Sequence, residues 1–454
     1  MDDQSLPSDL TAIPPQYSED ALAMRFSARH ADSLRYVALF GKWYEWKSPV
    51  WREDTTLNVY DLARVVCRES AAELGDKSKD QSVAKLLTAG KTVAAVEKMA
   101  RSDRRHAATK DQWDAFPWLV NTPDGLFDLQ QQTLLGPLQE AYATKITGSV
   151  IDFGCPCPIW LQFLNRVMGG NEELINYLQR VCGYCLTGIT RDHALFFLHG
   201  KGANGKSVFV NTIAGILADY HRAAPVEIFM ETKNERHPTE LAMLVGARLV
   251  TAIETEEGRR WAESRIKALT GGDPISARFM RQDFFEFKPQ FKLMIAGNHK
   301  PAIRTVDEAI RRRLNLIPFT VTIPPNERDP DLSEKLREEY PGILAWMVAG
   351  CLEWQAGGLR PPGEVQAATA AYLEAEDSLS QWMTEAGKRD PEWFESDARL
   401  FASWVSWANR SGEFVGKRKQ FIEKIEGVGL EPHRENSARG HKGFRLFYDA
   451  EAEA

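Results

Sequence analysis

The stretch "LFFLHGKGANGKSVFVNTI", from Leu195 to Ile213, places an apolar segment before a loop of glycine, asparagine and lysine, and then continues as an amphipathic run. Residues 200–207 read Gly-x-x-x-x-Gly-Lys-Ser, the spacing of a phosphate-binding P-loop. The flanks predict a buried strand over 194–198 and a helix after the loop. Backbone N–H groups of such a loop bind phosphate oxygens at the helix N-terminus. We therefore expect a nucleoside triphosphate to be bound by Gly200, Gly202, Asn204, Gly205, Lys206, Ser207 and Val208, with Lys206 on the β/γ-phosphates and Ser207 on Mg²⁺.

The size and charge of the chain limit the remaining possibilities. Its 454 residues are long enough for two or three domains, and no apolar run approaches the roughly 18 residues of a membrane span. The sequence thus predicts a cytoplasmic protein without a membrane partner. The net charge of −7 requires any nucleic-acid binding to be local. Residues 259–315 supply a local excess, with 13 Lys/Arg against 6 Asp/Glu, a balance of +7.

Four of the six cysteines form two close pairs, Cys155/Cys157 and Cys182/Cys185. Such pairs can bind zinc. The second pair, however, lies in the helical pattern "LINYLQRVCGYCLTG", where cysteines three residues apart usually fill a core. The sequence therefore favours structural cysteines over a zinc site.

The chain divides into five predicted parts. Residues 1–20 are expected to be a flexible arm, and 21–157 an N-terminal domain with hairpins at "YVALFGKWYEW"/"PVWRED" and "LVNTPDGLFDLQQQTLLGP" and helices at 56–74 and 81–102. Residues 158–190 are expected to be a helical connector. Strands at 248–254, 291–297 and 314–319 alternate with other segments and indicate an α/β nucleotide-binding core over 191–355. A linker over 357–365 leads to a C-terminal domain, 366–454, with helices at 367–387, 395–412 and 416–429 and then a basic hairpin.

Polar residues stand where the core strands end. Glu254 ends one strand and suits a Mg²⁺ ligand, and Glu256 suits the residue that orients the attacking water, with Glu257 as the alternative. Asn298 ends the next strand and is placed to hold that water near the γ-phosphate. Further on, "AIRRRLNLIPF" sets three arginines before a buried strand, and one of them could act as an arginine finger in trans.

Two basic regions are candidates for DNA binding. In "ARFMRQDFFEFKPQFK", Arg281 and Lys288 flank three phenylalanines, so a hairpin there could neutralise phosphates and stack on bases. The alternative is that these phenylalanines pack beneath the hairpin. Near the C-terminus, the helix pattern containing Lys417, Arg418 and Lys419 and the hairpin "SARGHKGF" suit a winged helix on duplex DNA, with solvated basic surface as the alternative.

The segments "HGKGANGKS", "VTAIETEEG", "IKALTGGDPISARFM", "FKPQFKLMIAGNHKP" and "AIRRRLNLIPF" together resemble superfamily 3 DNA helicases of the phage, plasmid and poxvirus primase-helicase branch. The resemblance implies an α/β fold: a P-loop AAA+-type ATPase core between an α-rich N-terminal helicase-associated domain and a C-terminal winged-helix domain. It implies ATP and Mg²⁺ as cofactors. The expected function is a ring-forming DNA helicase, expected to be a hexamer, that acts on single-stranded and forked DNA in the replication of a mobile element.

The same resemblance implies roles for single residues. Lys206 and Ser207 bind ATP and Mg²⁺, Glu254 and Glu256 fall in the Walker B region, Asn298 matches the sensor, and Arg313 matches the finger supplied in trans. Lys267 and the segment from Arg278 to Lys292 match an additional motif and a hairpin of the ring's channel. The Walker B region departs from the adjacent acidic pair of other branches, so Glu256 and Glu257 both stay open.

Partners implied by the resemblance include an origin duplex and a primase or polymerase supplied by another chain. The only Asp-x-Asp, Asp329/Asp331, follows the core and suits a helix cap, so no primase activity is expected here. Two other classes of function also use a P-loop. A P-loop kinase would need an acceptor pocket and lid and would not need the basic hairpin, whereas a non-translocating NTP-gated replication initiator would bind DNA without unwinding it.

Overall fold

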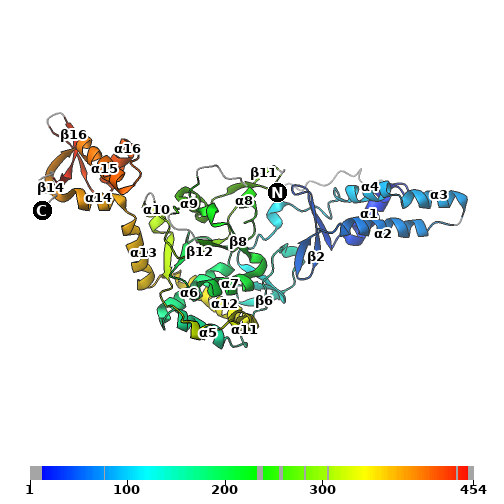
Figure 1. Cartoon of the computed structure of the whole chain (residues 1–454). Coiled ribbons are helices and arrows are strands. Elements are labelled where there is room, and N and C mark those ends of the chain that lie inside the picture. The colour runs from blue at the N-terminus through cyan, green and yellow to red at the C-terminus, as the bar shows by residue number, and fades with distance from the viewer. Residues whose placement is uncertain are drawn as a thin grey trace.

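The computed structural model describes residues 13–75, 77–232, 239–254, 259–280, 283–303, 306–435 and 438–447. These residues form an elongated molecule, with a central α/β body, a helical N-terminal part at one end and a small C-terminal module at the other (Figure 1). The helix α13 (Gly363–Ala375) joins the body to the C-terminal module. Among the described residues, no helix is long and apolar enough to cross a membrane.

The central body is built on a five-stranded sheet with the order β13-β7-β12-β9-β8. Every strand pair in it is parallel. The strands are β7 (Leu195–His199), β8 (His221–Ala223), β9 (Leu249–Glu254), β12 (Lys292–Gly297) and β13 (Leu314–Pro318). The sequence prediction of an α/β core is confirmed at this level. Parallel strands covered on both faces need continuous apolar runs, and β7 and β12 supply them.

Helices and short turns cover the sheet. The helix α7 (Lys206–Leu217) follows β7, and α6 (Glu172–Leu186) packs against α12 (Tyr340–Gly357). The other elements of the body are α5 (Pro158–Val167), η4 (Ala218–Tyr220), η5 (Val226–Phe229), α8 (Thr239–Ala242), α9 (Glu263–Gly271), α10 (Glu308–Arg311), η6 (Pro325–Glu327) and α11 (Leu332–Glu338). Cys182, Cys185 and Cys351 are fully buried among these helices. Within the described ranges no cluster of His, Cys, Asp or Glu could hold a metal ion, so the cysteine pairs gain no support as a zinc site.

A two-stranded hairpin, β10 (Ile275–Arg278) and β11 (Phe284–Phe287), projects from the body next to the N-terminal part (Figure 1). One of its faces is anchored there. Phe279 and Phe285 stack at 5.1 Å between ring centroids, and Phe40 meets both rings edge-on. Lys110 Nζ donates to the carbonyl of Glu286 at 2.9 Å. Burial of Phe285 agrees with packing beneath the hairpin for that residue, whereas Phe284 is 58% exposed.

The N-terminal part consists of helices and two small antiparallel sheets. The helices α1 and α2 pack against α4 around Phe26, Val66 and Val96. Its elements are α1 (Glu19–His30), β1 (Leu34–Val37), β2 (Lys42–Lys47), β3 (Val50–Glu53), α2 (Asn58–Ala72), α3 (Ser78–Leu87), α4 (Gly90–Ala100), η2 (Lys110–Gln112), β4 (Leu119–Thr122), β5 (Gly125–Asp128), β6 (Thr133–Gly136) and η3 (Gln139–Ala141).

The C-terminal module places three helices against a three-stranded antiparallel sheet of order β14-β16-β15. Its core is aromatic, with Trp382, Trp404 and Phe421 in mutual ring contact. The elements are α14 (Ser378–Ala386), β14 (Gly387–Ser396), α15 (Asp397–Ser411), α16 (Arg418–Gly427), β15 (Glu431–Glu435) and β16 (Ala438–Leu446).

Several boundaries differ from the sequence predictions. The helix α1 begins inside the predicted arm 1–20, where Ser18 caps it. The predicted helix at 81–102 is two helices, and so is the one at 367–387, where Asp377 caps a new helix. The strand β14 was not predicted. Tyr372 and Leu373 of α13 join the apolar cluster of the central sheet, so residues 366–375 pack with the body and not with the C-terminal domain to which the sequence assigned them.

Fewer basic side chains of residues 259–315 reach the surface than the sequence count of Lys and Arg suggests. Lys292 is 2% exposed, and its amine donates to the carbonyls of Thr187 at 2.5 Å and Ile189 at 3.2 Å. Burial lowers the pKa of Lys292 to about 7. Arg313 is likewise buried. These two cations support the interior of the body and add nothing to a DNA-binding surface in this conformation.

Candidate functional site

The glycine-rich loop 200–205 connects β7 to α7 and is shaped by close contacts with the body. A Cβ on Gly200 would lie 2.0 Å from the carbonyl oxygen of Phe319, so only glycine fits there. Gly205 has φ +85°, and a Cβ on it would approach Val167 Cγ1 to 2.5 Å. Gly202, in contrast, is exposed, and a Cβ there would meet nothing within 4 Å. Close contacts therefore require glycine at positions 200 and 205. No contact requires it at position 202, which faces open space.

Asn204 and Lys206 fix the interior of this loop. Asn204 is 3% exposed and donates from Nδ2 to the carbonyl of Phe319 at 3.0 Å. Lys206 Nζ donates to the carbonyl of Gly200 at 2.5 Å and to Asn204 Oδ1 at 3.2 Å. Burial lowers the pKa of Lys206. The amine is thus held across the loop, while the next residue, Ser207, is exposed in the first turn of α7 and Val208 is partly buried.

The structure brings Asn298 to Lys206. Asn298 follows the end of β12, and its Oδ1 accepts from Lys206 Nζ at 3.1 Å. These two residues, 92 positions apart, were singled out separately in the sequence and meet at one point.

Glu254 ends β9 at the same edge of the sheet. In the strand register, Gly297 pairs with both Glu254 and His199, so the carboxyl ends of β7, β12 and β9 lie level with one another. Ligands of open α/β sheets bind beyond the carboxyl ends of the strands. The backbone of Glu254 therefore lies at the correct edge, whereas Glu256 and Glu257 lie outside the described residues.

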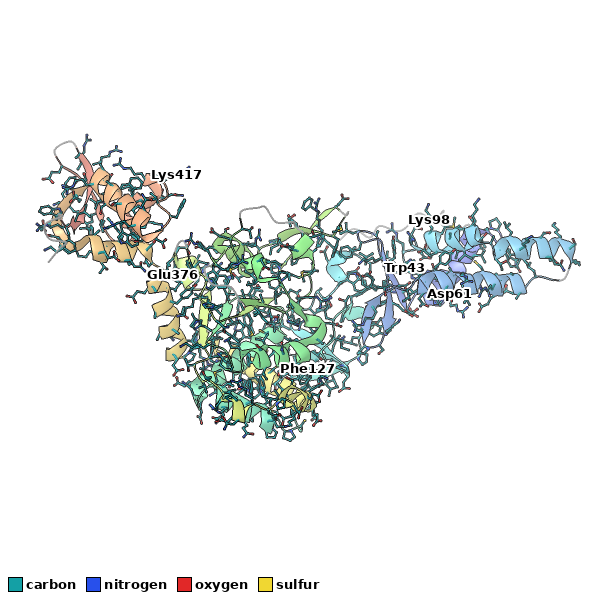
Figure 2. The ribbon with its side chains drawn as sticks, in the orientation of Figure 1. Trp43, Asp61, Lys98, Phe127, Glu376 and Lys417 are labelled. Carbon is teal, nitrogen blue, oxygen red and sulfur yellow. The ribbon has the colours of Figure 1, made fainter. Side chains whose placement is uncertain are left out.

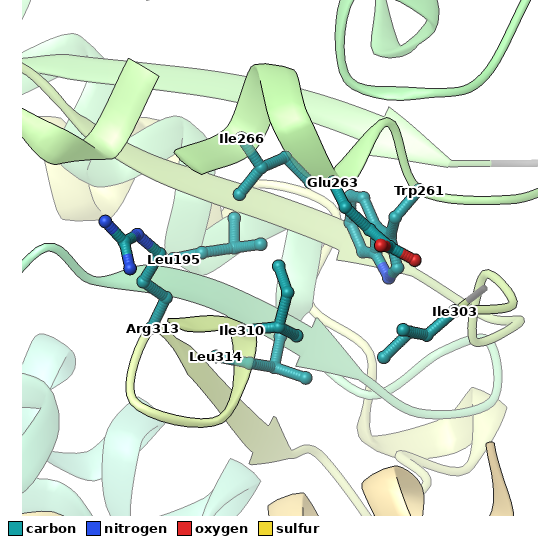
Figure 3. A pocket seen from close by; sticks show the side chains of 8 residues that line it. All are labelled: Leu195, Trp261, Glu263, Ile266, Ile303, Ile310, Arg313 and Leu314. Atoms are coloured by element: carbon teal, nitrogen blue, oxygen red, sulfur yellow. The ribbon is translucent and has the colours of Figure 1, made fainter. Parts of the chain in front are cut away.

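Arg313 lies between α10 and β13, at the edge of a small pocket lined by Leu195, Glu263 and Ile310 among others (Figure 3). It is 6% exposed. Its Nε donates to Thr270 Oγ1 at 3.0 Å and its guanidinium donates to the carbonyl of Ala309 at 2.9 Å. The Arg313 side chain would have to break both hydrogen bonds before it could reach a neighbouring subunit. The sequence alone does not reveal these bonds.

The other two arginines of the run face outward. Arg311 and Arg312 are exposed and border a cavity of about 310 Å³ formed with α13. Arg311 lies 3.7 Å from the carboxylate of Asp377. Arg312 is therefore exposed where its neighbour Arg313 is buried.

Lys267 is partly exposed and is bonded within the body. Its amine forms an ion pair with Asp307, whose side chain also caps α10 by accepting from Ile310 N at 2.9 Å. Burial acts to raise the pKa of Asp307, but the bond from Lys267 and the backbone N–H groups of Ile310 and Ala309 outweigh it and lower the pKa. The contact supports the helix that leads into the arginine run, and the role of Lys267 in DNA binding stays a prediction.

The predicted DNA-binding residues of the hairpin are spread along it. Arg278 lies next to the tip with its guanidinium 5.1 Å from the ring centroid of Phe284, and Met280 at the turn is 76% exposed. Lys288 is exposed but follows β11 at the base of the hairpin, where Ile275 pairs with Phe287. Arg281 lies outside the described residues. Among the described residues near the tip, Met280 and Phe284 are the exposed large apolar side chains.

The C-terminal basic residues are accessible. Lys417, Arg418 and Lys419 are all exposed at the start of α16, and Figure 2 shows Lys417 at the surface of the module. Lys419 lies 3.9 Å from Glu423 in a solvent-exposed pair, a kind of contact worth little.

The sequence did not reveal the residues whose hydrogen bonds fix Asn204 and Arg313 in place. Phe319 supplies the carbonyl that anchors Asn204, and Thr270 holds Arg313. Both contacts arise from tertiary packing, so no local pattern could have revealed them. For Asp307 a local signal exists, because an Asp before "EAIRRR" is a typical helix cap, but no local pattern reveals its pairing with Lys267.

Two family models match separate parts of the chain. Residues 23–169 match the model described as "D5 N terminal like", and residues 198–313 match one described as "Family of unknown function (DUF5906)". The first covers the N-terminal part and the connector as far as α5. The second covers the glycine-rich loop, β9, β12 and the arginine run.

Related viral proteins bear helicase names. The chain is 27% identical over 240 residues to "Putative helicase L207/L206" of Acanthamoeba polyphaga mimivirus, over 49% of this chain and 25% of that protein. It is 25% identical over 305 residues to "Putative helicase 022R" of Frog virus 3 (isolate Goorha), over 61% of this chain and 31% of that protein. The chain thus spans between a quarter and a third of these relatives' lengths.

Among solved structures, the fold resembles one described as "The A form apo structure of NrS-1 C terminal region-CTR". The TM-score is 0.51 at 11% identity, with 91% of this chain and 96% of that chain covered. At this identity the likeness concerns the fold alone. Together, the comparisons show a D5-like N-terminal part and a similarity to viral proteins named as helicases.

Proposed function

We propose that this chain is an ATP-dependent DNA helicase of a mobile element or virus. The observation that carries the proposal is the contact of Lys206 Nζ with Asn298 Oδ1 at 3.1 Å, which joins the P-loop to the sensor position at the carboxyl edge of the sheet. Lys206 would neutralise the β/γ-phosphate charge, and Asn298 would hold the attacking water. The helicase names of the relatives and the D5-like N-terminal part support the same function.

The loop residues fit ATP and Mg²⁺. Lys206 has its amine held across the loop, Gly202 leaves room for close approach of a phosphate, and Ser207 presents an exposed hydroxyl at the N-terminus of a 12-residue helix. Ser207 and Glu254 would hold Mg²⁺, which would neutralise phosphate charge. Glu256, or Glu257, would orient the attacking water.

The C-terminal module is proposed to bind duplex DNA as a winged helix. The order α14, β14, α15, α16, β15, β16 supports this reading, with α16 as the helix that enters the groove and the β15–β16 hairpin as the wing. Lys417, Arg418 and Lys419 lie at the exposed start of α16. An origin duplex is the expected partner, beside a separate primase or polymerase.

The first measurement that tests the proposed function is ATP turnover with and without single-stranded DNA, followed by unwinding of a forked duplex. We expect DNA to stimulate turnover and the fork to be unwound, because the hairpin and the ATP site lie in one body. DNA binding without turnover or unwinding would instead identify a nucleotide-gated initiator. Turnover that is indifferent to DNA would contradict both readings and favour transfer to a small acceptor.

Substitution of Phe284 tests the hairpin. Because its ring is 58% exposed and flanked by Arg278, Phe284→Ala should weaken single-stranded DNA binding by about 5- to 100-fold, the loss of one base stack, and leave basal ATP turnover unchanged. Phe116→Ala, which removes another exposed phenylalanine, is the matched control. Fluorescence anisotropy with labelled oligonucleotide measures the affinity. Equal affinities for the two variants would exclude the hairpin as a stacking surface.

A further inference from the structure

The C-terminal end of α13 is bonded to both segments that leave the proposed ATP site. The hydroxyl of Tyr372, which is 2% exposed, donates to the carbonyl of Pro301 and accepts from Trp261 Nε1 at 2.9 Å. Pro301 comes three residues after Asn298, and Trp261 follows the acidic segment that begins at Glu254. One buried hydroxyl therefore ties the loop after β12 to the loop after β9.

These two loops are also bonded to each other. Trp261 N donates to the carbonyl of Ala302 at 3.0 Å, and Ala302 N donates to the carbonyl of Arg259 at 2.8 Å. A displacement of either loop is thus shared by the other, since each bond joins backbone to backbone. The hydroxyl of Tyr372, on α13, adds a third link between the two loops.

The next turn of the chain adds two charged contacts. Glu376 Oε2 accepts from Ile303 N at 2.8 Å, and Asp377 lies 3.7 Å from Arg311 of the arginine run. Asp377 also caps α14, the first helix of the C-terminal module, by accepting from Ser380 N at 3.3 Å. Figure 2 shows Glu376 at the junction between α13 and that module. The residues that begin the module therefore touch the segments that carry the proposed sensor and finger.

We propose that Tyr372 and Glu376 are positioning residues that couple the nucleotide site to DNA binding by the C-terminal module. The coupling runs from the module through α14 and α13 to the loops after β12 and β9, and it rests on the proposed function of both ends. Neither residue touches nucleotide; each acts through the backbone it holds, Pro301 or Ile303. Coupling of this kind is reciprocal, so nucleotide must change duplex affinity by the same factor by which duplex changes nucleotide affinity.

The test compares duplex affinity in the presence and absence of a non-hydrolysable ATP analogue. For the full wild-type chain we expect the two affinities to differ by about 5- to 150-fold, the usual range for allosteric coupling. In Tyr372→Phe, which keeps the ring and loses the hydroxyl, the ratio should fall toward one while analogue binding alone stays within about twofold. Glu376→Gln is the second variant, and Glu374→Gln, on an exposed side chain of the same helix, is the matched control.

The outcomes separate this inference from the proposed function. A ratio in both variants equal to that of wild type, or a wild-type ratio of one with normal binding of both ligands, overturns the coupling and leaves the helicase proposal intact. Loss of analogue binding in both variants assigns them a merely structural role and also overturns it. Failure of the wild-type chain to bind either ligand overturns the proposed function and the coupling together.

Discussion

Replacing Lys206 with alanine should abolish ATP turnover and fork unwinding. The amine is held by Gly200 O and Asn298 Oδ1 at the point where the phosphate charge is expected, so its loss removes a preorganised donor. Removal of one such donor typically lowers turnover about 10²- to 10³-fold. Steady-state phosphate release, with equilibrium binding of a fluorescent ATP analogue, measures the effect.

Stability must be followed alongside this measurement, because Lys206 is 7% exposed and not a surface residue. Its neighbours are carbonyl oxygens that lose one donor each, so we expect a stability loss of about 1–2 kcal/mol and a folded variant by circular dichroism. Lys335→Ala is the matched control, since that lysine is exposed and forms a surface ion pair with Asp329. Wild-type turnover by a folded Lys206→Ala protein would exclude the loop as the hydrolytic site.

The sequence predicted the centre of the fold better than its edges, and the reason is physical. The apolar runs around β7, β9, β12 and β13 are long and bounded by polar residues, so their type and order could be inferred from pattern alone. The break between α13 and α14 is harder to see, because Ala375 to Ser378 contains no glycine or proline and its local signal is the single cap residue Asp377. The bond from Ile303 N to Glu376 is a tertiary contact at the same point, which no local pattern reveals.

The candidate site shows the same division. The loop glycines and Asn298 lie at positions that spacing makes visible, and the structure brings Lys206 and Asn298 together. Lys267 and Lys292 were counted as basic surface, but one is paired with Asp307 and the other is buried against carbonyl oxygens. Composition reports how many charges a segment carries and not which of them reach solvent. The assignment of Arg313 as a finger in trans stays a prediction for this reason.

The assignment of Arg313 as a finger in trans predicts that two inactive variants regain ATP turnover when they are mixed. If each active site combines Lys206 of one subunit with Arg313 of its neighbour, Arg313→Ala should bind ATP but hydrolyse it about 10³-fold more slowly or worse. Mixed with Lys206→Ala, it should regain turnover above the sum of the two alone. Some interfaces then pair an intact P-loop with an intact finger.

The exposed neighbour Arg312 makes the experiment decisive. Arg313 begins 6% exposed and bonded to Thr270 Oγ1, so assembly must release it, whereas Arg312 already faces outward. We expect Arg312→Ala to keep most of its turnover and therefore to need no complementation. Co-assembly of the mixed proteins is established first by mass photometry, with a size tag on one of them. The finger role would instead belong to Arg312 under two conditions. Arg313→Ala would keep full turnover, and Arg312→Ala would be inactive alone but active when mixed with Lys206→Ala. If neither arginine variant regains ATP turnover in a co-assembled mixture with Lys206→Ala, the result counts against an active site shared between subunits. No mixed interface would then have supplied the missing positive charge.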